Sequence, residues 1–167
     1  MANTTPLPET EIAKLLRLLG ETPTRLAAMT STLASERLER KVNEDEWTVN
    51  EILAHLRVCA EVWGQSILVM ISQDQPTLRY VSPRTVAKKR TYATQPFAAS
   101  LSEFSQQRHE LIQQLRALAQ EGWSRGATFT GTTRGRTQTV LSYVQRIVDH
   151  EAAHLLQIEQ ILRAENA

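Results

Sequence analysis

Several features that define protein classes are scarce or missing in this chain. It has one cysteine, Cys59, in 167 residues, so no disulfide can form within the chain. Its 19 basic and 18 acidic residues give a net charge of +1, which removes the general electrostatic argument for nucleic acid or an anionic membrane as partner. No uninterrupted apolar run approaches the about 18 residues of a membrane span, and the N-terminal segment lacks the basic and apolar regions of a signal peptide. These absences predict a cytoplasmic protein that binds neither nucleic acid nor membrane.

The chain also lacks internal repeats, low-complexity tracts and sustained strand alternation. With 41% hydrophobic residues and no shift in composition, it fits one domain spanning residues 1–167. What it does contain is four segments with apolar residues at helical spacing, at about 9–33, 48–72, 97–120 and 137–163. This pattern predicts an all-α four-helix bundle.

The ends of these helices carry local signals. Thr22 followed by Pro23 predicts a kink in the first helix, with a new helical turn starting there. Thr48 and Glu51 form a capping-box pattern that starts the second helix. The polar connection at 73–96 is too long for a simple hairpin and could cross the length of the bundle, while 121–139 predicts a loop with a short extended piece at 127–130.

Three histidines suggest one metal ion. His150 and His154 are four residues apart, so on a helix they differ by about 40° of rotation and about 6 Å of rise. They share a stripe with Ile147 and Ile158 and should face the core, as should His55 on the second helix. Neutral imidazoles suit zinc, nickel, iron or copper, and three protein ligands leave positions open for water or substrate.

The segment His150 to His154 also matches the H-E-x-x-H motif of zinc proteases, in which the glutamate activates water. We discount this interpretation because the motif specifies only three positions and residues 155–165 supply no third histidine. Glu151 remains a candidate catalytic residue that could orient a ligand imidazole or move a proton, as could Asp149. The alternative is that Glu151 is simply solvated.

Two stretches carry a resemblance to a known family. The tryptophan-led segment EWTVNEILAHL, at 46–56, ends near His55, and the fourth helix contains the pattern H-x-x-x-H-x-x-Q-I at 150–158. With the helix at 104–118 and GWSR at 122–125, these segments resemble the DinB/YfiT-like metalloproteins over about residues 9–163. The residue after the first histidine of the fourth helix, often aspartate in relatives, is Glu151 here.

The resemblance implies a four-helix bundle with a long connection between its second and third helices, and His55, His150 and His154 as metal ligands. It also implies a homodimer. Characterised members of the family include transferases and isomerases that use low-molecular-weight thiols such as bacillithiol or mycothiol. We therefore expect a divalent metal ion, zinc or nickel first and iron or copper as alternatives, and a small-molecule substrate that includes such a thiol.

Three functions follow from this site. In a thiol-dependent transferase, the favoured function, the cation stabilises thiolate over thiol at neutral pH. In a metal-dependent hydrolase, the cation activates water while Glu151 or Asp149 handles protons. In a non-catalytic stress-response or binding bundle, the metal is structural or absent; the lack of an obvious fourth ligand argues against this third function.

Other residues have less specific interpretations. Six basic residues could recognise substrate carboxylates, although a solvated surface is the commoner role: Arg84, Lys88, Lys89, Arg90, Arg134 and Arg136. Four more residues are predicted to lie outside the metal site. His109 should be exposed, Cys59 should be a small core residue although it is one turn from His55, and Trp47 and Trp123 should serve packing. Trp63 should pack as well, or form the wall of a pocket.

Overall fold

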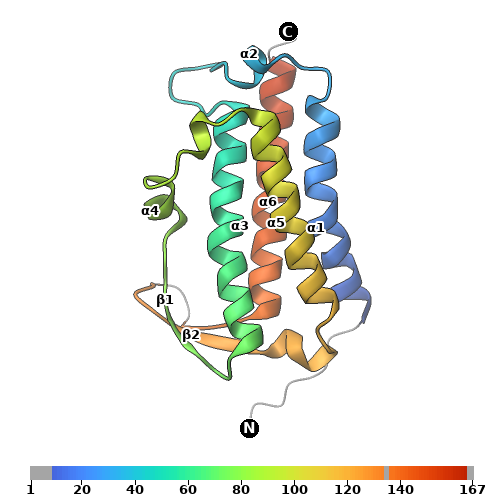
Figure 1. Cartoon of the computed structure of the whole chain (residues 1–167), viewed down its shortest axis with the longest axis vertical. Helices are drawn as coiled ribbons and strands as arrows, with labels where there is room; N and C mark the ends of the chain where they lie inside the picture. The colour runs from blue at the N-terminus through green and yellow to red at the C-terminus, as the bar shows by residue number, and fades with distance from the viewer. Residues whose placement is uncertain (1–8, 134–135, 165–167) are drawn as a thin grey trace.

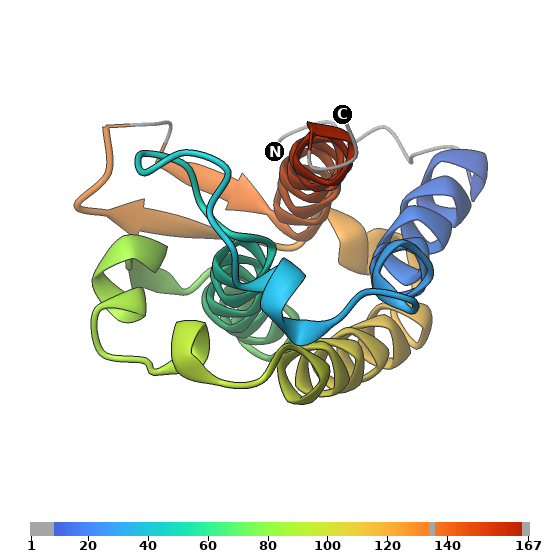
Figure 2. The ribbon, with the colours of Figure 1, turned by 90° about the horizontal axis from the view of Figure 1, so that it is seen from above.

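Four long helices run side by side along the longest axis of the molecule (Figure 1). The computed structural model describes residues 9–133 and 136–164. The long helices are α1 (Glu9–Thr30), α3 (Val49–Ser72), α5 (Phe97–Arg116) and α6 (Val140–Ala164). Seen from above, α1 and α3 lie diagonally opposite each other, and each packs against both α5 and α6 (Figure 2). The predicted all-α four-helix bundle is confirmed.

Shorter elements fill the connections. They are α2 (Ser35–Leu38), β1 (Thr77–Arg79), α4 (Pro83–Ala87), η1 (Tyr92–Thr94), η2 (Gln120–Ser124), β2 (Gly126–Thr130) and β3 (Thr137–Thr139). The connection between α3 and α5 holds β1, α4 and η1 and runs along α3 from one end of the bundle to the other (Figure 1). The predicted long crossing connection is therefore observed.

The connection lies against α3 because several polar contacts hold it there. Asn50 Nδ2 donates to the carbonyl oxygens of Ala93 and Gln95 at 3.2 and 3.1 Å. Glu61 accepts from the Tyr92 hydroxyl at 3.0 Å and forms an ion pair with Arg90. This segment forms one side of the cavity described below.

The second helix starts as its sequence predicts. The backbone N–H of Glu51 donates to Thr48 Oγ1 at 3.0 Å, and the backbone N–H of Thr48 donates to Glu51 Oε2 at 2.7 Å. This capping box fixes the first turn of α3, two turns before His55. By length and composition α3 would also pass as a membrane span, with a mean hydropathy of 1.2 over 18 residues, but 56% of that window is buried inside the bundle. A core helix has the same composition.

The prediction of a new helical start at Thr22 is wrong, because α1 is one continuous helix with Pro23 inside it. Proline has no N–H, so the carbonyl of Leu19, four residues earlier, loses its usual helical donor. Arg108 Nη1, from α5, donates to that carbonyl at 3.1 Å. A tertiary hydrogen bond thus replaces the missing helical one.

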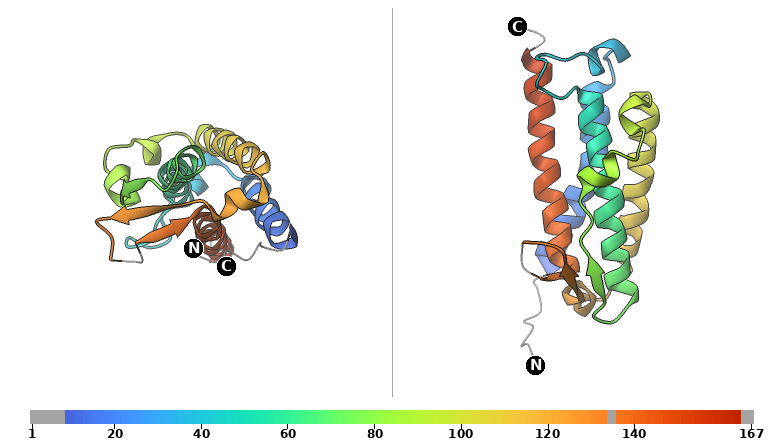
Figure 3. Two further views of the ribbon diagram at one scale, coloured as in Figure 1. Left: turned by 90° about the horizontal axis from the view of Figure 1, so that it is seen from below. Right: turned by 90° about the vertical axis from the view of Figure 1, so that its left-hand side faces the viewer.

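A small sheet at one end of the bundle goes beyond the sequence predictions (Figure 3). β2 confirms the predicted extended piece and pairs in parallel with β1 and antiparallel with β3. Because residues 137–139 pair with β2, α6 begins at Val140, later than predicted. A Cβ at Gly126 would lie 2.5 Å from the carbonyl oxygen of Gln138, so this close pairing requires glycine.

Candidate metal centre and adjoining cavity

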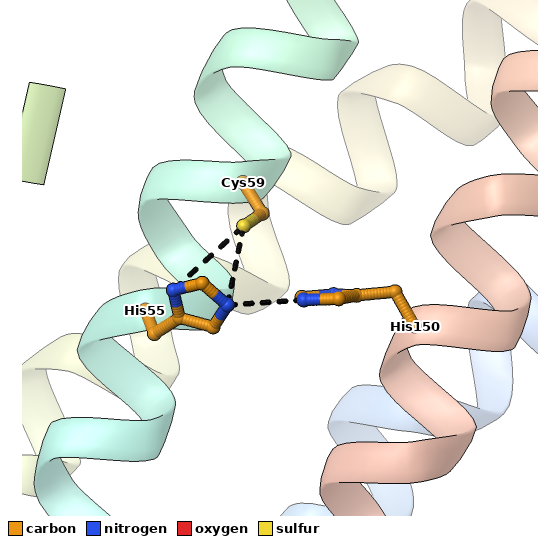
Figure 4. Close-up of side chains that lie close together, drawn as sticks. All are labelled: His55, Cys59 and His150. Carbon is orange, nitrogen blue, oxygen red and sulfur yellow. Dashed lines mark hydrogen bonds between the residues drawn. The ribbon is translucent and has the colours of Figure 1, made fainter. Parts of the chain in front are cut away.

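Helices α3 and α6 bring three imidazoles together. His55 Nε2 lies 3.0 Å from His150 Nε2, and His154 Nε2 lies 3.1 Å from the same atom. Two imidazole nitrogens bound to one tetrahedral zinc ion lie about 3.3 Å apart, given bonds of about 2.0–2.1 Å. Two of the three pairs of Nε2 atoms, both involving His150, therefore lie at about the spacing of ligands on a shared cation. Figure 4 shows two of them, His55 and His150, facing each other across the gap between the helices.

The hydrogen bonding of the cluster also fits a cation. Gln157 Oε1 lies 2.8 Å from His154 Nδ1, and an amide oxygen can only accept, so Nδ1 carries the hydrogen and Nε2 presents a lone pair. His150 Nε2 contacts two other ring nitrogens, and a single hydrogen on it cannot serve both. A metal ion bound by all three nitrogens would satisfy every one of these lone pairs.

Burial keeps two of the imidazoles neutral. Burial, and secondly the nearby His154, lowers the pKa of His55 and that of His150 to about 4. Arg84 is a smaller cause of the lowered pKa of His55. At neutral pH these two rings are in the unprotonated form that binds metals.

Cys59 lies closer to the cluster than its predicted role implied. It is buried, as expected of a small core residue, but its Sγ lies 3.6 Å from His55 Nε2 (Figure 4). The ligand atoms of Cys59, His55 and His150 all fall within 4.8 Å of one another, so the thiol is available as an additional or alternative ligand. Burial, and secondly the charge of Glu151, raises its pKa to about 12.

The alternative interpretation of Glu151, that it is simply solvated, is wrong. Its side chain is buried and paired through both carboxylate oxygens with the buried guanidinium of Arg108. Arg108 Nη1 donates to Glu151 Oε2 at 2.8 Å and also to the Leu19 carbonyl, so the pair joins α6, α5 and α1. Neither oxygen is left to activate water in the manner of a zinc protease, and we no longer assign Glu151 a catalytic role.

Aromatic rings flank the histidines on two sides. Trp63 makes an edge-to-face contact with His150, with ring centroids 4.9 Å apart, and thereby forms a wall as the alternative interpretation held. Trp47 was predicted to serve packing, but it is 44% exposed and lies 5.0 Å from the His55 ring and 6.3 Å from that of His154. No periodic signal marks it, because it precedes the helix. Trp123 is buried in the core and His109 is exposed, as predicted.

A cavity of about 890 Å³ opens beside the histidines. Its walls come from α3, α4, α6 and the sheet, and include His55, His150, Trp63 and Tyr143. A second hollow of about 400 Å³ also borders His55 and is lined by Trp47 and Tyr92, among others. A small molecule in the larger cavity would therefore contact two of the three imidazoles.

The basic residues that the sequence grouped together do not all lie at the cavities. Arg84 lines both cavities, while Lys88 and Arg90 line only the smaller one. Lys89 and Arg136 are exposed and line neither of the two, and Arg134 lies outside the described residues. The sequence pattern missed Arg146, which lines the larger cavity from α6, because it falls among the apolar residues of that helix. Asp149 also lines that cavity, as an acid that accepts from Gln145 Nε2 at 2.8 Å.

Comparison with known proteins identifies the class. A family model for the DinB superfamily matches residues 18–158. The chain belongs to the DinB superfamily, as its sequence motifs indicated. A comparison with curated proteins found no match.

Among solved structures, the fold is similar to that of YfiT from Bacillus subtilis, described as a probable metal-dependent hydrolase with an unusual four-helix bundle topology. The TM-score is 0.83 over 99% of this chain and 94% of that chain. Sequence identity is 17%, so the similarity establishes the shared fold.

Proposed function

We propose that this protein is a metal-dependent enzyme whose divalent cation is held by His55, His150 and His154. The observation that supports this most strongly is the convergence of three Nε2 atoms beside an open cavity. Neutral nitrogen ligands favour zinc or nickel, with iron or copper as alternatives. When bound, such a cation lowers the pKa of a coordinated thiol or water and so supplies a nucleophile at neutral pH.

The first candidate reaction is transfer of a low-molecular-weight thiol to a small electrophile. The sulfur forms a bond to the electrophilic carbon, the bond to the leaving group breaks, and the thiol proton departs with that group. The cavity is within the about 300–1,000 Å³ range of small-molecule sites. Gln157 fixes the ring of His154, and Trp63 packs against that of His150, so the chain orients the imidazoles before any substrate arrives.

The second candidate reaction is hydrolysis of a small substrate. YfiT, which has a similar fold, is described as a probable metal-dependent hydrolase. With Glu151 bound by Arg108, the carboxylate that lines the cavity is that of Asp149, and we propose it as the proton carrier in this reaction.

An assay that follows both reactions tests this function. Protein loaded with zinc or nickel is incubated with a panel of small thiols and an alkyl halide or epoxide, and separately with small esters and amides. Free thiol, conjugate and released acid are measured. We expect metal-dependent loss of thiol with formation of conjugate, abolished in His150→Ala and unchanged in the exposed control His109→Ala. Metal-dependent release of acid without conjugation would instead establish the hydrolase, and no metal-dependent turnover of any kind would leave the non-catalytic bundle as the better account.

The proposal extends to the protein's location, oligomeric state and partners. We propose that it acts in the cytoplasm as a homodimer, on a small-molecule substrate, without nucleic-acid or membrane partners. Light scattering coupled to size-exclusion chromatography should give twice the 18.9 kDa chain mass. A mass of one chain at micromolar concentration would contradict the dimer.

A further inference from the structure

Two arginines in the larger cavity have no acidic partner. Arg84 comes from α4 and Arg146 from α6, one turn before His150. Within residues 9–133 and 136–164, neither guanidinium has a carboxylate within 4.0 Å. Neighbouring arginines differ, since Arg90 pairs with Glu61 and Arg108 with Glu151. The two arginines that line the larger cavity therefore have no counter-ion within that distance.

Arg146 is held in place by aromatic rings. Its guanidinium carbon lies 4.8 Å from the Tyr143 ring centroid and 6.0 Å from that of Trp63, and both rings line the same cavity. The side chain is half-buried, so its charge has lost part of its hydration without gaining a counter-ion. Stacked guanidinium groups with free N–H donors are well suited to bind carboxylate or phosphate.

Arg84 reaches the same cavity from α4, in the connection between α3 and α5. It lines both the larger cavity and the smaller hollow beside His55, and no side-chain hydrogen bond to it is found among the described residues. Asp149 is the acidic residue among the cavity walls, so the two arginines outnumber it. The charge of the cavity therefore favours an anionic ligand.

We propose that Arg84 and Arg146 form an anion-binding subsite, which receives a carboxylate or phosphate group of a small acidic substrate while its reactive atom lies at the histidine cluster. This inference rests on the proposed function and names its substrate class. A substrate with an acidic group would be oriented by the arginines before reaction. Neutral analogues of the same size should bind more weakly.

Direct binding tests the subsite without any assay of turnover. Isothermal titration of metal-loaded protein with glutarate and with inorganic phosphate, at constant ionic strength, is compared for the wild type, Arg84→Gln and Arg146→Gln. Each substitution should weaken binding of the preferred anion by about 10-fold or more, since a hydrogen bond to a charged group is lost. The anion that binds more tightly identifies carboxylate or phosphate as the recognised group.

Four controls complete the design. Arg116→Gln, at an exposed position on α5 away from the cavity, should bind the anion like the wild type. Arg146→Lys keeps the charge and should restore part of the affinity, and melting temperatures verify folding. The metal content of each variant is measured separately. The subsite would be overturned if the wild type bound no anion, or if the wild type and both glutamine variants bound it equally at full metal content. If the protein held no metal but anion binding still depended on the two arginines, the result would instead count against the metal site.

Discussion

His150 is the central residue of the histidine cluster, because the Nε2 atoms of His55 and His154 both lie close to its Nε2 atom. Its spacing from His154 follows from helix geometry alone, and its closeness to His55 follows from the packing of α3 on α6. Its Nδ1 is buried without a hydrogen-bond partner among the described residues, whereas Gln157 serves His154. Metal binding at this site depends on a few imidazole nitrogens, so substitution of single residues should separate their contributions.

Cys59 is the residue whose role can be decided most simply. Three imidazoles already supply a ligand set, so we expect Cys59→Ser to retain nearly the metal content of the wild type. Its cobalt-loaded form should show the same absorption spectrum as the wild type, without a sulfur-to-cobalt charge-transfer band in either. Loss of the metal in Cys59→Ser, or a charge-transfer band in the wild type, would make the thiol a fourth ligand and the site a closed one.

The neutral histidines predict a pH dependence of the metal-free protein. As the pH falls below 6.5 the unfolded chain takes up protons at His55 and His150, whereas the folded chain does so only near pH 4. The unfolded state then binds more protons, so the free energy of unfolding decreases across this window and is greatest above pH 6.5. Thermal melts between about pH 7 and pH 4 should show a falling melting temperature. The double variant His55→Gln/His150→Gln should show a shallower fall, and parallel curves would refute this origin.

Among the helices, α1, α5 and α6 are connected by buried hydrogen bonds of one side chain, Arg108. Pro23 frees the Leu19 carbonyl, and Arg108 binds both that carbonyl and Glu151. Helical periodicity predicted the long helices, and the capping box predicted the start of α3, because these signals are local. The Arg108–Glu151 pair was not predictable, since its members are 43 residues apart and only tertiary packing brings them together. Strands β1 and β3 also escaped prediction, because three residues are too few to show alternation.

Breaking that buried pair should be costly. Arg108→Met leaves the Glu151 charge without a partner and should lower the free energy of unfolding by about 3–5 kcal/mol. Adding Glu151→Leu removes the stranded charge and should recover part of this loss, while the Leu19 carbonyl still lacks its donor. Urea unfolding of the two variants measures both effects. A double variant as unstable as the single one, or one that folds yet no longer binds metal, would contradict a purely structural role for Glu151.

For the chain as a whole, the similarity to YfiT at 17% identity shows that the bundle fold is shared although few residues are identical. The long connection between α3 and α5 supplies Arg84, while α6 supplies Arg146 and two of the three histidines. The sequence predicted the four helices and the three histidines, because each depends on spacing along one helix. It did not predict the cavity, the exposed position of Trp47 or the partner of Glu151, which depend on how separate segments meet.

If three histidines hold one metal ion, the metal content of the purified protein must depend on each of them. Protein purified without a histidine tag is analysed by elemental mass spectrometry as wild type, His55→Ala, His150→Ala and His154→Ala, with His109→Ala as the matched control on an exposed surface. We expect about one equivalent of metal in the wild type and the control, and loss of the metal in each of the other three variants. No metal in the wild type after incubation with zinc, nickel, iron and copper, or full retention in the three site variants, would contradict this expectation.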